Sequence, residues 1–371
     1  VSFIQNGLNV ENKQNKNAIP IVIASSDEYV PYATVFLKSL KDHTSPNNFY
    51  EINILEKDIT LAHKKQIREL IEQDNIKIRF INTKKVLQPF ENLCKDKHYS
   101  VETYSRIFIP NLLPEYDKCV YLDIDMLVLD DVAKLYLETD LDGHSLAMAK
   151  DPVMNYIYYS GNKNKMKKYF NEVLEMPNSN LYFQNGVGIF NLKKMRENND
   201  IEQLCKKVEK MKVMFNDQCI YNHYYKDDVV FIDNSWNYEI EHKNMKDNNA
   251  LIYLPIDLMQ GYLRAKENPK IIHYAGNRKP WSFPDEEFAN LWWEYARKTP
   301  FYEEIISRIY EKGALGKVLS CLLNYRLNVL RYWKYKLLSE ISFGKAKKRY
   351  MFKRYLYKAR IKVLKPFKKF N

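Results

Sequence analysis

The stretch Cys119-Val-Tyr-Leu-Asp123-Ile-Asp125-Met-Leu-Val-Leu-Asp-Asp131 is an apolar run interrupted at its centre by two carboxylates. If residues 120–129 form one β-strand, Asp123 and Asp125 point to the same face, because side chains i and i+2 of a strand do so. Two carboxylates in apolar surroundings are costly to bring together unless a cation neutralises them. The spacing therefore predicts a divalent metal site with hard oxygen ligands, which suit Mn²⁺ or Mg²⁺.

Apolar runs that look like strands alternate with helix-like segments on both sides of this stretch. The expected strands are 18–24, 50–55, 76–81, 120–129, 146–150, 186–191, 229–232 and 270–274, and the expected helices are 31–43, 61–72, 85–93, 105–113, 201–211 and 217–225. This alternation predicts an α/β fold with a mostly parallel sheet covered by helices on both faces. Ligands of such sheets bind beyond the carboxyl ends of the strands, where Asp123 and the turn at 25–28 fall.

Charge is distributed unevenly along the 371 residues. With 46% hydrophobic and 28% charged residues, the chain can bury a large core. The net charge is +12, yet residues 305–371 alone hold 19 Lys and Arg against two Glu, so the rest of the chain is net acidic. We expect a polar leader at 1–18, an α/β domain at 19–283 and a helical, basic and aromatic region at 284–371.

The basic residues of 305–371 are interleaved with Tyr, Trp, Phe and Leu. This composition predicts a helical segment lying on an anionic membrane, with aromatic side chains at the headgroups and cations over the phosphates. The alternatives are a helix that packs its apolar face on the α/β domain and, less favoured, nucleic-acid binding, which we do not expect. No apolar run approaches the ~20 residues that span a bilayer.

Five scattered cysteines without CxxC spacing favour a reducing cytoplasm over a zinc ribbon or a disulfide framework.

A second group of residues with metal-site chemistry lies near residue 273. In Ile-Ile-His273-Tyr-Ala-Gly276-Asn-Arg-Lys279-Pro-Trp281, a histidine ends an apolar strand and precedes a glycine turn with two cations. His273 could complete a metal shell, Gly276 would let the backbone approach a phosphate, and Lys279 would supply a compensating charge. Read alone, His273 fits a structural histidine beside a turn better than a metal ligand.

Taken together, these motifs resemble those of the family 8 glycosyltransferases, which are retaining enzymes of GT-A fold that include the lipooligosaccharide α-galactosyltransferases and glycogenin. The resemblance covers roughly residues 20–282. It rests on an ordered series of motifs: Ala24-Ser-Ser-Asp-Glu-Tyr29-Val-Pro31-Tyr32, Thr103-Tyr-Ser-Arg106, Tyr121-Leu-Asp-Ile-Asp125, Phe183-Gln-Asn-Gly186-Val-Gly-Ile-Phe-Asn191, Asn216-Asp-Gln218 and the segment from His273 to Trp281. Each motif is modestly specific alone, whereas the ordered set is very specific.

The resemblance implies a role for each matching position. Asp123, Asp125 and His273 would hold Mn²⁺, with Mg²⁺ as the second choice, and Gly276 and Lys279 would grip the diphosphate of a UDP-sugar. The remaining donor-binding residues would surround the nucleoside and the sugar: Ala24, Ser25, Ser26, Asp27, Tyr29, Arg106, Ile124, Asn185, Gly186, Asp217 and Gln218. Tyr29 would stack on uracil, and Asp27 or a serine hydroxyl would accept its N3–H. Asp151 could face the acceptor, or could equally be a turn residue before Pro152.

The resemblance further implies transfer of a hexose to a cell-surface glycan, which is lipid- or protein-linked. UDP-galactose is the first choice and UDP-glucose the second. Because the amide of Gln218 is a poor nucleophile, we favour front-face substitution, with Gln218 stabilising a cationic sugar and Asp217 as the alternative nucleophile. The expected location is the cytoplasm, at the inner face of a bacterial membrane. The competing hypotheses are a haloacid-dehalogenase-type phosphatase with Asp123 as nucleophile and a non-catalytic basic membrane adaptor.

Overall fold

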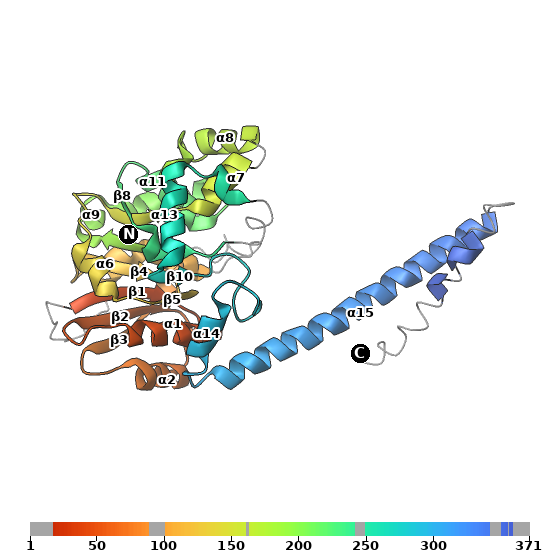
Figure 1. The fold of residues 1–371 in the computed structure, drawn as a ribbon, viewed down its shortest axis with the longest axis horizontal. Helices are drawn as coiled ribbons and strands as arrows, with labels where there is room; N and C mark the ends of the chain where they lie inside the picture. The colour runs from red at the N-terminus through yellow and green to blue at the C-terminus, as the bar shows by residue number, and fades with distance from the viewer. Residues whose placement is uncertain are drawn as a thin grey trace. The chain divides into compact units, whose positions relative to one another are not determined.

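The structure of the chain, a computed structural model, describes residues 18–88, 101–160, 163–241, 249–341, 350–354 and 356–358. Of the leader expected at 1–18, only Ala18 lies within these ranges, where it begins the first strand. The described residues form two compact units, which divide between Tyr302 and Glu303. Figure 1 shows the labelled elements of the larger unit and the long helix α15.

The larger unit is built on a seven-stranded sheet with the order β3-β2-β1-β4-β7-β6-β8. Its strands are β1 (Ala18–Ala24), β2 (Phe49–Glu56), β3 (Ile76–Asn82), β4 (Lys118–Leu122), β6 (Leu146–Lys150), β7 (Phe183–Asn191) and β8 (Val229–Ile232). All neighbouring pairs are parallel except the two that involve β7, which runs antiparallel to β4 and β6. The expected α/β fold with a mostly parallel, mixed sheet is therefore confirmed.

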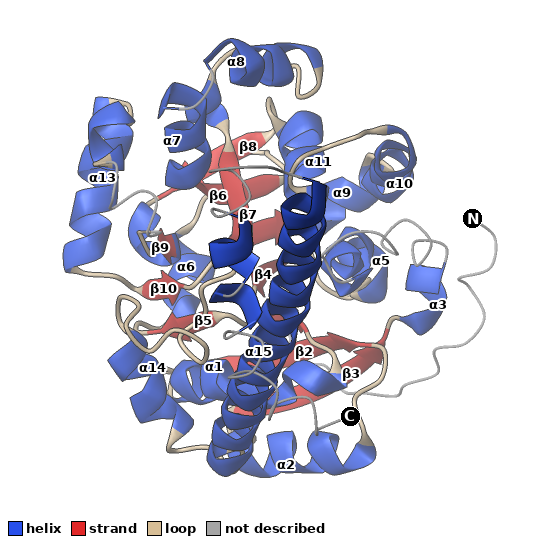
Figure 2. Ribbon diagram, turned by 90° about the vertical axis from the view of Figure 1, so that its right-hand side faces the viewer, coloured by secondary structure: helices blue, strands red, loops and turns tan. Residues whose placement is uncertain are grey.

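Helices cover both faces of this sheet, with α1, α13 and α14 on one side and α5, α9, α10 and α11 on the other in Figure 2. The helices are α1 (Val30–Asp42), α2 (Leu61–Ile71), α3 (Lys84–Leu87), α5 (Ile109–Leu112), α6 (Val132–Glu138), α7 (Pro152–Ser160), α8 (Lys163–Glu172), α9 (Leu192–Glu197), α10 (Asp200–Lys210), α11 (Asn216–Tyr225), α13 (Ile256–Glu267), α14 (Ala289–Ala296) and α15 (Tyr302–Ile341). β1 is almost entirely buried because helices lie on both of its faces.

A second, three-stranded sheet contains β5 (Met126–Val128), β10 (Ile271–His273) and β9 (Tyr238–Glu239) in the order β5-β10-β9. β10 runs antiparallel to β5 and parallel to β9. The strand expected at 120–129 is wrong as one element, because its two ends pair in different sheets. The chain leaves the large sheet after Leu122 and joins the small one at Met126, so Asp123 and Asp125 lie in the bend between them.

The larger unit ends beyond the domain boundary expected at residue 283. Trp292 of α14 is fully buried, and its ring lies 5.3 Å from that of Trp281. Trp281 in turn stacks on Tyr32 of α1 at 4.4 Å. This aromatic cluster attaches α14 to α1 and anchors the segment that follows His273. Of the helix expected at 85–93, the described part is α3, and residues 89–93 lie outside the described ranges.

Candidate active site

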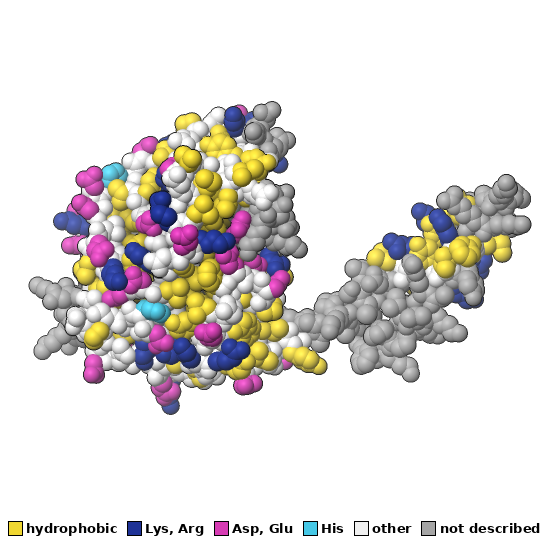
Figure 3. Space-filling view, viewed as in Figure 1, with side chains coloured by type: hydrophobic (Ala, Val, Ile, Leu, Met, Phe, Trp, Pro, Cys, Tyr) yellow, Lys and Arg dark blue, Asp and Glu magenta, His cyan; other side chains and the backbone are white. Residues whose placement is uncertain are grey.

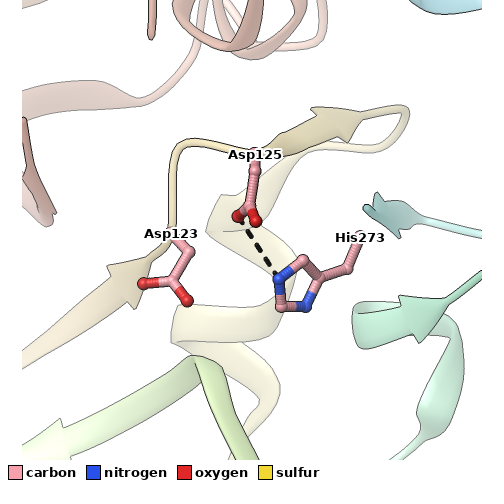
Figure 4. A group of neighbouring side chains, drawn as sticks. All are labelled: Asp123, Asp125 and His273. Carbon is pink, nitrogen blue, oxygen red and sulfur yellow. Dashed lines mark ion pairs between the residues drawn. The ribbon is translucent and has the colours of Figure 1, made fainter. Parts of the chain in front are cut away.

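The two central carboxylates and His273 converge where the two sheets meet. Asp123, Asp125 and His273 each offer one ligand atom, and these atoms all lie within 4.8 Å of one another. His273 Nε2 lies 3.3 Å from Asp125 Oδ1, and Asp123 points into the same space (Figure 4). Two carboxylate oxygens and one imidazole nitrogen suit Mn²⁺ or a similar divalent cation, so the residues fit a metal.

A hydrogen bond from the buried side of His273 leaves the other ring nitrogen facing the carboxylates. His273 Nδ1 lies 2.9 Å from Oδ1 of Asn237, in the 3₁₀ turn η5 (Asn234–Asn237), just before β9. The Asn237 amide nitrogen donates to Gln184 Oε1 at 2.8 Å, so the Asn237 oxygen must accept from the imidazole. This orientation places a proton on Nδ1 and directs Nε2 toward Asp125, so Nε2 is the ring atom that a metal would bind.

Replacing Asn237 with Ala is expected to weaken Mn²⁺ binding about 10- to 100-fold, because outer partners of metal-ligating histidines have effects of that size. Isothermal titration of the purified chain with MnCl₂ measures the affinity directly. Asn198→Ala, at the end of α9, is a matched control because Asn198 makes only backbone hydrogen bonds among the described contacts. Equal Mn²⁺ affinities for the Asn237 variant and the wild type would contradict the role of Asn237.

Gly186 occupies a position beside the metal-site residues that has no room for a side chain. A Cβ at Gly186 would lie 2.6 Å from His273 Cε1 and 2.7 Å from Asp123 Oδ2. The backbone of Gly186 is also engaged, because its oxygen accepts from Asp123 N at 2.8 Å and its N–H donates to Gln184 Oε1 at 2.6 Å. The glycine thus lets β7 approach the ligands and hold the Asp123 backbone in place.

Gly186→Ala is therefore expected to displace His273 or Asp123 and to lower Mn²⁺ affinity by about tenfold or more. The control is Gly261→Ala in α13, where the nearest atom to an added Cβ lies 3.7 Å away. Electron paramagnetic resonance of free Mn²⁺ during titration distinguishes the two variants. If the Gly186 variant bound Mn²⁺ as tightly as the Gly261 variant, the close approach would have no bearing on the ligands.

Lys279 lies against the metal site. Its ammonium group donates to Asp125 Oδ2 and, at 2.7 Å, to the backbone oxygen of Tyr274. Burial alone would raise the pKa of Asp125, but Lys279 and then His273 outweigh burial and hold that pKa well below its usual range. Gly276, at φ +75°, makes the left-handed turn that folds Lys279 back toward Asp125.

Arg106 is a buried guanidinium that joins several predicted site residues. Its Nη2 donates to Asp123 Oδ1 at 3.0 Å, its Nη1 to the backbone oxygen of Asn185 at 2.6 Å, and its Nε lies 3.0 Å from Asp217 Oδ2. Burial would lower the pKa of Arg106, but Asp217 and Asp123 raise it, so the group stays charged. With every arm of its guanidinium engaged by protein, Arg106 organises the site.

The pair Asp217-Gln218 begins α11, and the two side chains have different partners. Asp217 Oδ2 accepts from Asn185 Nδ2 at 3.0 Å in addition to its ion pair with Arg106. Gln218 instead donates from Nε2 to Asp151 Oδ2 at 2.7 Å. Asp151 follows β6 and is 3% exposed, so the structure brings it together with Gln218 rather than leaving it in an open turn.

The predicted nucleoside-binding loop follows the carboxyl end of β1. The Tyr29 residue is 44% exposed, and its ring lies edge-on to that of Tyr32 at 5.9 Å. Burial, together with Glu28, Tyr32 and Asp125, raises the pKa of Tyr29. Ser25 is buried, whereas Ala24, Ser26 and Ile124 are partly exposed. Tyr29 thus offers an open aromatic face near the metal-site carboxylates.

One carboxylate oxygen of Asp27 is already engaged by other residues of the protein. Its Oδ1 accepts from Thr60 N at 2.8 Å and lies 2.7 Å from His63 Nδ1. Burial raises the pKa of Asp27, but the Thr60 and His63 hydrogen bonds outweigh it and lower that pKa. Asp27 therefore ties the loop after β1 to the start of α2.

Tyr121, Gln184 and Asn237 belong to the hydrogen-bond network of the site but were absent from the sequence-based prediction. Tyr121 and Gln184 lie within recognised motifs, next to or near predicted residues, so their positions were a usable signal. Asn237 lies in an unremarkable Asn-Ser-Trp-Asn segment, 36 residues before its partner His273, and nothing in its spacing marks it. Only the pairing of β9 with β10 brings the two together.

Comparison with known proteins places these residues in a family. The model of Glycosyl transferase family 8 matches residues 20–284. Glycosyltransferase GlyF of Streptococcus pneumoniae is 28% identical over 280 residues, which cover 74% of this chain and 60% of GlyF. General stress protein A of Bacillus subtilis is 22% identical over 272 residues, covering 71% of this chain and 87% of that protein.

Two solved structures share the fold. The apo structure of the WbbM bifunctional glycosyltransferase has 30% identity and a TM-score of 0.70, over 81% of this chain and 53% of WbbM. The galactosyltransferase LgtC, in complex with donor and acceptor sugar analogs, has 25% identity and a TM-score of 0.62, over 76% of this chain and 96% of LgtC. The chain thus spans only about half to three fifths of WbbM and GlyF, but nearly all of LgtC.

Proposed function

Because the chain belongs to glycosyl transferase family 8, we propose that it transfers a hexose from a UDP-sugar to a hydroxyl of a glycan acceptor, with retention of configuration. The observation that carries this proposal is the convergence of Asp123, Asp125 and His273 at the junction of the two sheets. Galactose is the first choice of sugar, supported by the similarity to a galactosyltransferase, and glucose is the second. The family match leaves the dehalogenase-type phosphatase without support.

The donor would lie across the ends of β1 and β4. Uracil would stack on the exposed ring of Tyr29, with Ser26 and the backbone near Ala24 reading its edge. Asp123, Asp125 and His273 would hold Mn²⁺, which when bound neutralises charge that develops on the departing diphosphate. Lys279 would contribute a further positive charge at the same place, turning from Asp125 toward the diphosphate.

The sugar would sit beside Asn185 and Gln218. Asp217 is a poor candidate nucleophile because its Oδ2 is engaged by Arg106 and Asn185. We therefore favour front-face substitution. The bond from the anomeric carbon to the diphosphate oxygen breaks, the acceptor oxygen bonds to the same face, and the acceptor proton passes to the leaving phosphate. Gln218 would stabilise the positive charge on the sugar during this exchange.

A donor-hydrolysis assay tests the proposal without a known acceptor. The full chain is incubated with UDP-galactose or UDP-glucose, with MnCl₂ or with EDTA, and release of UDP is followed. We expect slow, Mn²⁺-dependent release that is faster from UDP-galactose. Absence of metal-dependent release from any UDP-sugar would refute the proposal, and turnover of p-nitrophenyl phosphate would restore the phosphatase hypothesis.

The basic C-terminal region, 305–371, would attach the enzyme to the anionic inner face of the cell membrane. In the described part of α15, Leu330, Trp333 and Leu337 are each more than half exposed and lie three and four residues apart, hence on one face. Basic residues lie between them in the sequence. Figure 3 shows apolar and basic side chains intermixed on the smaller of the two compact units. None of the described helices combines the length and apolarity needed to cross a bilayer.

Co-sedimentation with phosphatidylglycerol vesicles tests this attachment. We expect the wild type to pellet at low salt, and less at high salt because the cations are screened. The triple variant Leu330→Ser, Trp333→Ser, Leu337→Ser should pellet several-fold less, whereas Leu61→Ser, an exposed leucine of α2, should behave as wild type. Failure of the wild type to pellet at low salt would refute attachment through this region.

A further inference from the structure

Both carboxylate oxygens of Asp151 are used within the protein. Oδ1 accepts from Met154 N at 2.7 Å and so caps the first turn of α7. Oδ2 accepts from Gln218 Nε2 at 2.7 Å. The Asp151 backbone is equally fixed, because its N–H donates to Tyr182 O at 3.0 Å and its oxygen accepts from Asn155 Nδ2 at 2.8 Å. Asp151 is thus a rigid, 3% exposed group between β6 and α11.

This arrangement fixes which end of the Gln218 amide faces outward. Gln218 Nε2 donates to Asp151 Oδ2, so the NH₂ end of the amide faces Asp151. The carbonyl oxygen of Gln218 then points away from Asp151. The terminal torsion of glutamine is broad, so the hydrogen bonds of the amide decide its orientation, and Asp151 is the partner at 2.7 Å beside the buried hydroxyl of Tyr182. Asp151 therefore selects one of two amide orientations with opposite dipoles.

The start of α11 is itself held in a restricted geometry. Asn216 has a positive φ of 24°, an uncommon conformation that the surroundings must stabilise. The next residue, Asp217, is anchored to Arg106, and Gln218 is anchored to Asp151. Consecutive residues are thus tied to opposite sides of the site, which leaves the Gln218 backbone little freedom to compensate for a misdirected amide.

From these contacts we infer that Asp151 is a positioning residue that orients the Gln218 amide so that its carbonyl oxygen faces the sugar. The inference rests on the proposed function, in which positive charge develops on the anomeric carbon. The negative end of a fixed dipole stabilises that charge, whereas an NH₂ group in the same place would oppose it. Each oxygen of Asp151 already accepts a hydrogen bond from the protein, one from Met154 N and one from Gln218 Nε2.

The experiment measures hydrolysis of UDP-galactose and UDP-glucose with Mn²⁺ and without acceptor, so that acceptor binding does not contribute. Asp151→Asn is expected to lower kcat about 10- to 100-fold, while the donor KM changes less than about twofold. Gln218→Ala should lower kcat similarly. If Asp151 acts through Gln218, adding Asp151→Asn to Gln218→Ala should cause no further loss, because the two changes remove one interaction. Asp142→Asn, on an exposed turn, is the control.

A second variant tests the orientation itself. In Asp151→Asn, the remaining oxygen can still cap Met154, so the new NH₂ group faces Gln218 and forces its amide to turn over. Adding Gln218→Glu to this variant restores an oxygen toward the sugar, since a carboxylate has oxygens at both ends. The double variant should hydrolyse the donor at least about fivefold faster than Asp151→Asn, and also faster than Gln218→Glu alone, in which two carboxylates face each other.

The outcomes separate this inference from the proposed function. If the wild type hydrolyses a UDP-sugar but Asp151→Asn does so equally fast, Asp151 does not position Gln218, and the transferase proposal stands. The inference would also be overturned if the losses of kcat from Asp151→Asn and Gln218→Ala multiplied in the combined variant. The same holds if adding Gln218→Glu to Asp151→Asn gave no increase in the rate of donor hydrolysis. If the wild type releases no UDP, the proposed function itself fails.

Discussion

Replacing Asp125 with Asn is expected to lower Mn²⁺-dependent release of UDP by about 10³-fold, because a bound cation contributes several kcal/mol to stabilising the leaving group. The Asp125 carboxylate contacts both His273 and Lys279, and the Asp125 backbone oxygen accepts from Tyr274 N at 2.9 Å. Asn retains the size of the side chain but removes the charge and one ligand oxygen.

Mn²⁺ titration separates loss of metal from loss of fold. The Asp125 variant should keep the far-ultraviolet circular dichroism of the wild type while its Mn²⁺ affinity falls below detection. Asp74→Asn, in the exposed turn before β3, is the control, because it removes one carboxylate far from the site's ligands. An Asp125 variant that binds Mn²⁺ normally and turns over donor at the wild-type rate would rule out the proposed metal site.

The residues of the site come from three different parts of the fold. The bend from β4 to β5 supplies the carboxylates, β10 supplies His273, and β7 approaches through Gly186. Because β7 is antiparallel to β4, its beginning lies beside the end of β4, which brings Gly186 opposite Asp123. The antiparallel strand in an otherwise parallel sheet is thus what assembles the site.

The strands of the first half could be predicted because they are apolar on both faces. Residues 18–24 form β1, as expected, since both faces are covered by helices. The bend at Asp123 and Asp125 could not be predicted, because the apolar pattern continues unchanged from one sheet into the next. Helix α13 was missed because Gly261 and several polar residues obscure its apolar face.

The ligand residues were recognisable from their motifs, but their supporting contacts were not. Arg106 was expected among the donor-binding residues, but its contacts with Asp123 and Asp217 were not predicted. These partners come together only through the packing of the turn η3 (Val101–Phe108) and α11 against β4 and β7. Hydrogen-bond partners of this kind depend on side-chain direction in three dimensions, which residue spacing does not encode.

Arg106→Met is expected to destabilise the fold by about 3–5 kcal/mol, because it leaves Asp217 as a buried carboxylate without its cation. Asp217 is 4% exposed, so water cannot replace the guanidinium. The same substitution removes the donors to Asp123 Oδ1 and to the Asn185 backbone oxygen. Thermal unfolding followed by circular dichroism measures the effect, and Arg264→Met, an exposed arginine of α13, is the control.

A second substitution shows whether the unpaired charge is the cause. Adding Asp217→Asn to Arg106→Met removes the orphaned carboxylate, so the double variant should be more stable than Arg106→Met alone, although still below the wild type. Asn can keep a hydrogen bond with Asn185, which donates to the same oxygen in the wild type. The Tyr121 ring lies 4.5 Å from the guanidinium. If the double variant were less stable than Arg106→Met, the stability lost in Arg106→Met would come from packing against Tyr121 rather than from the unpaired charge of Asp217.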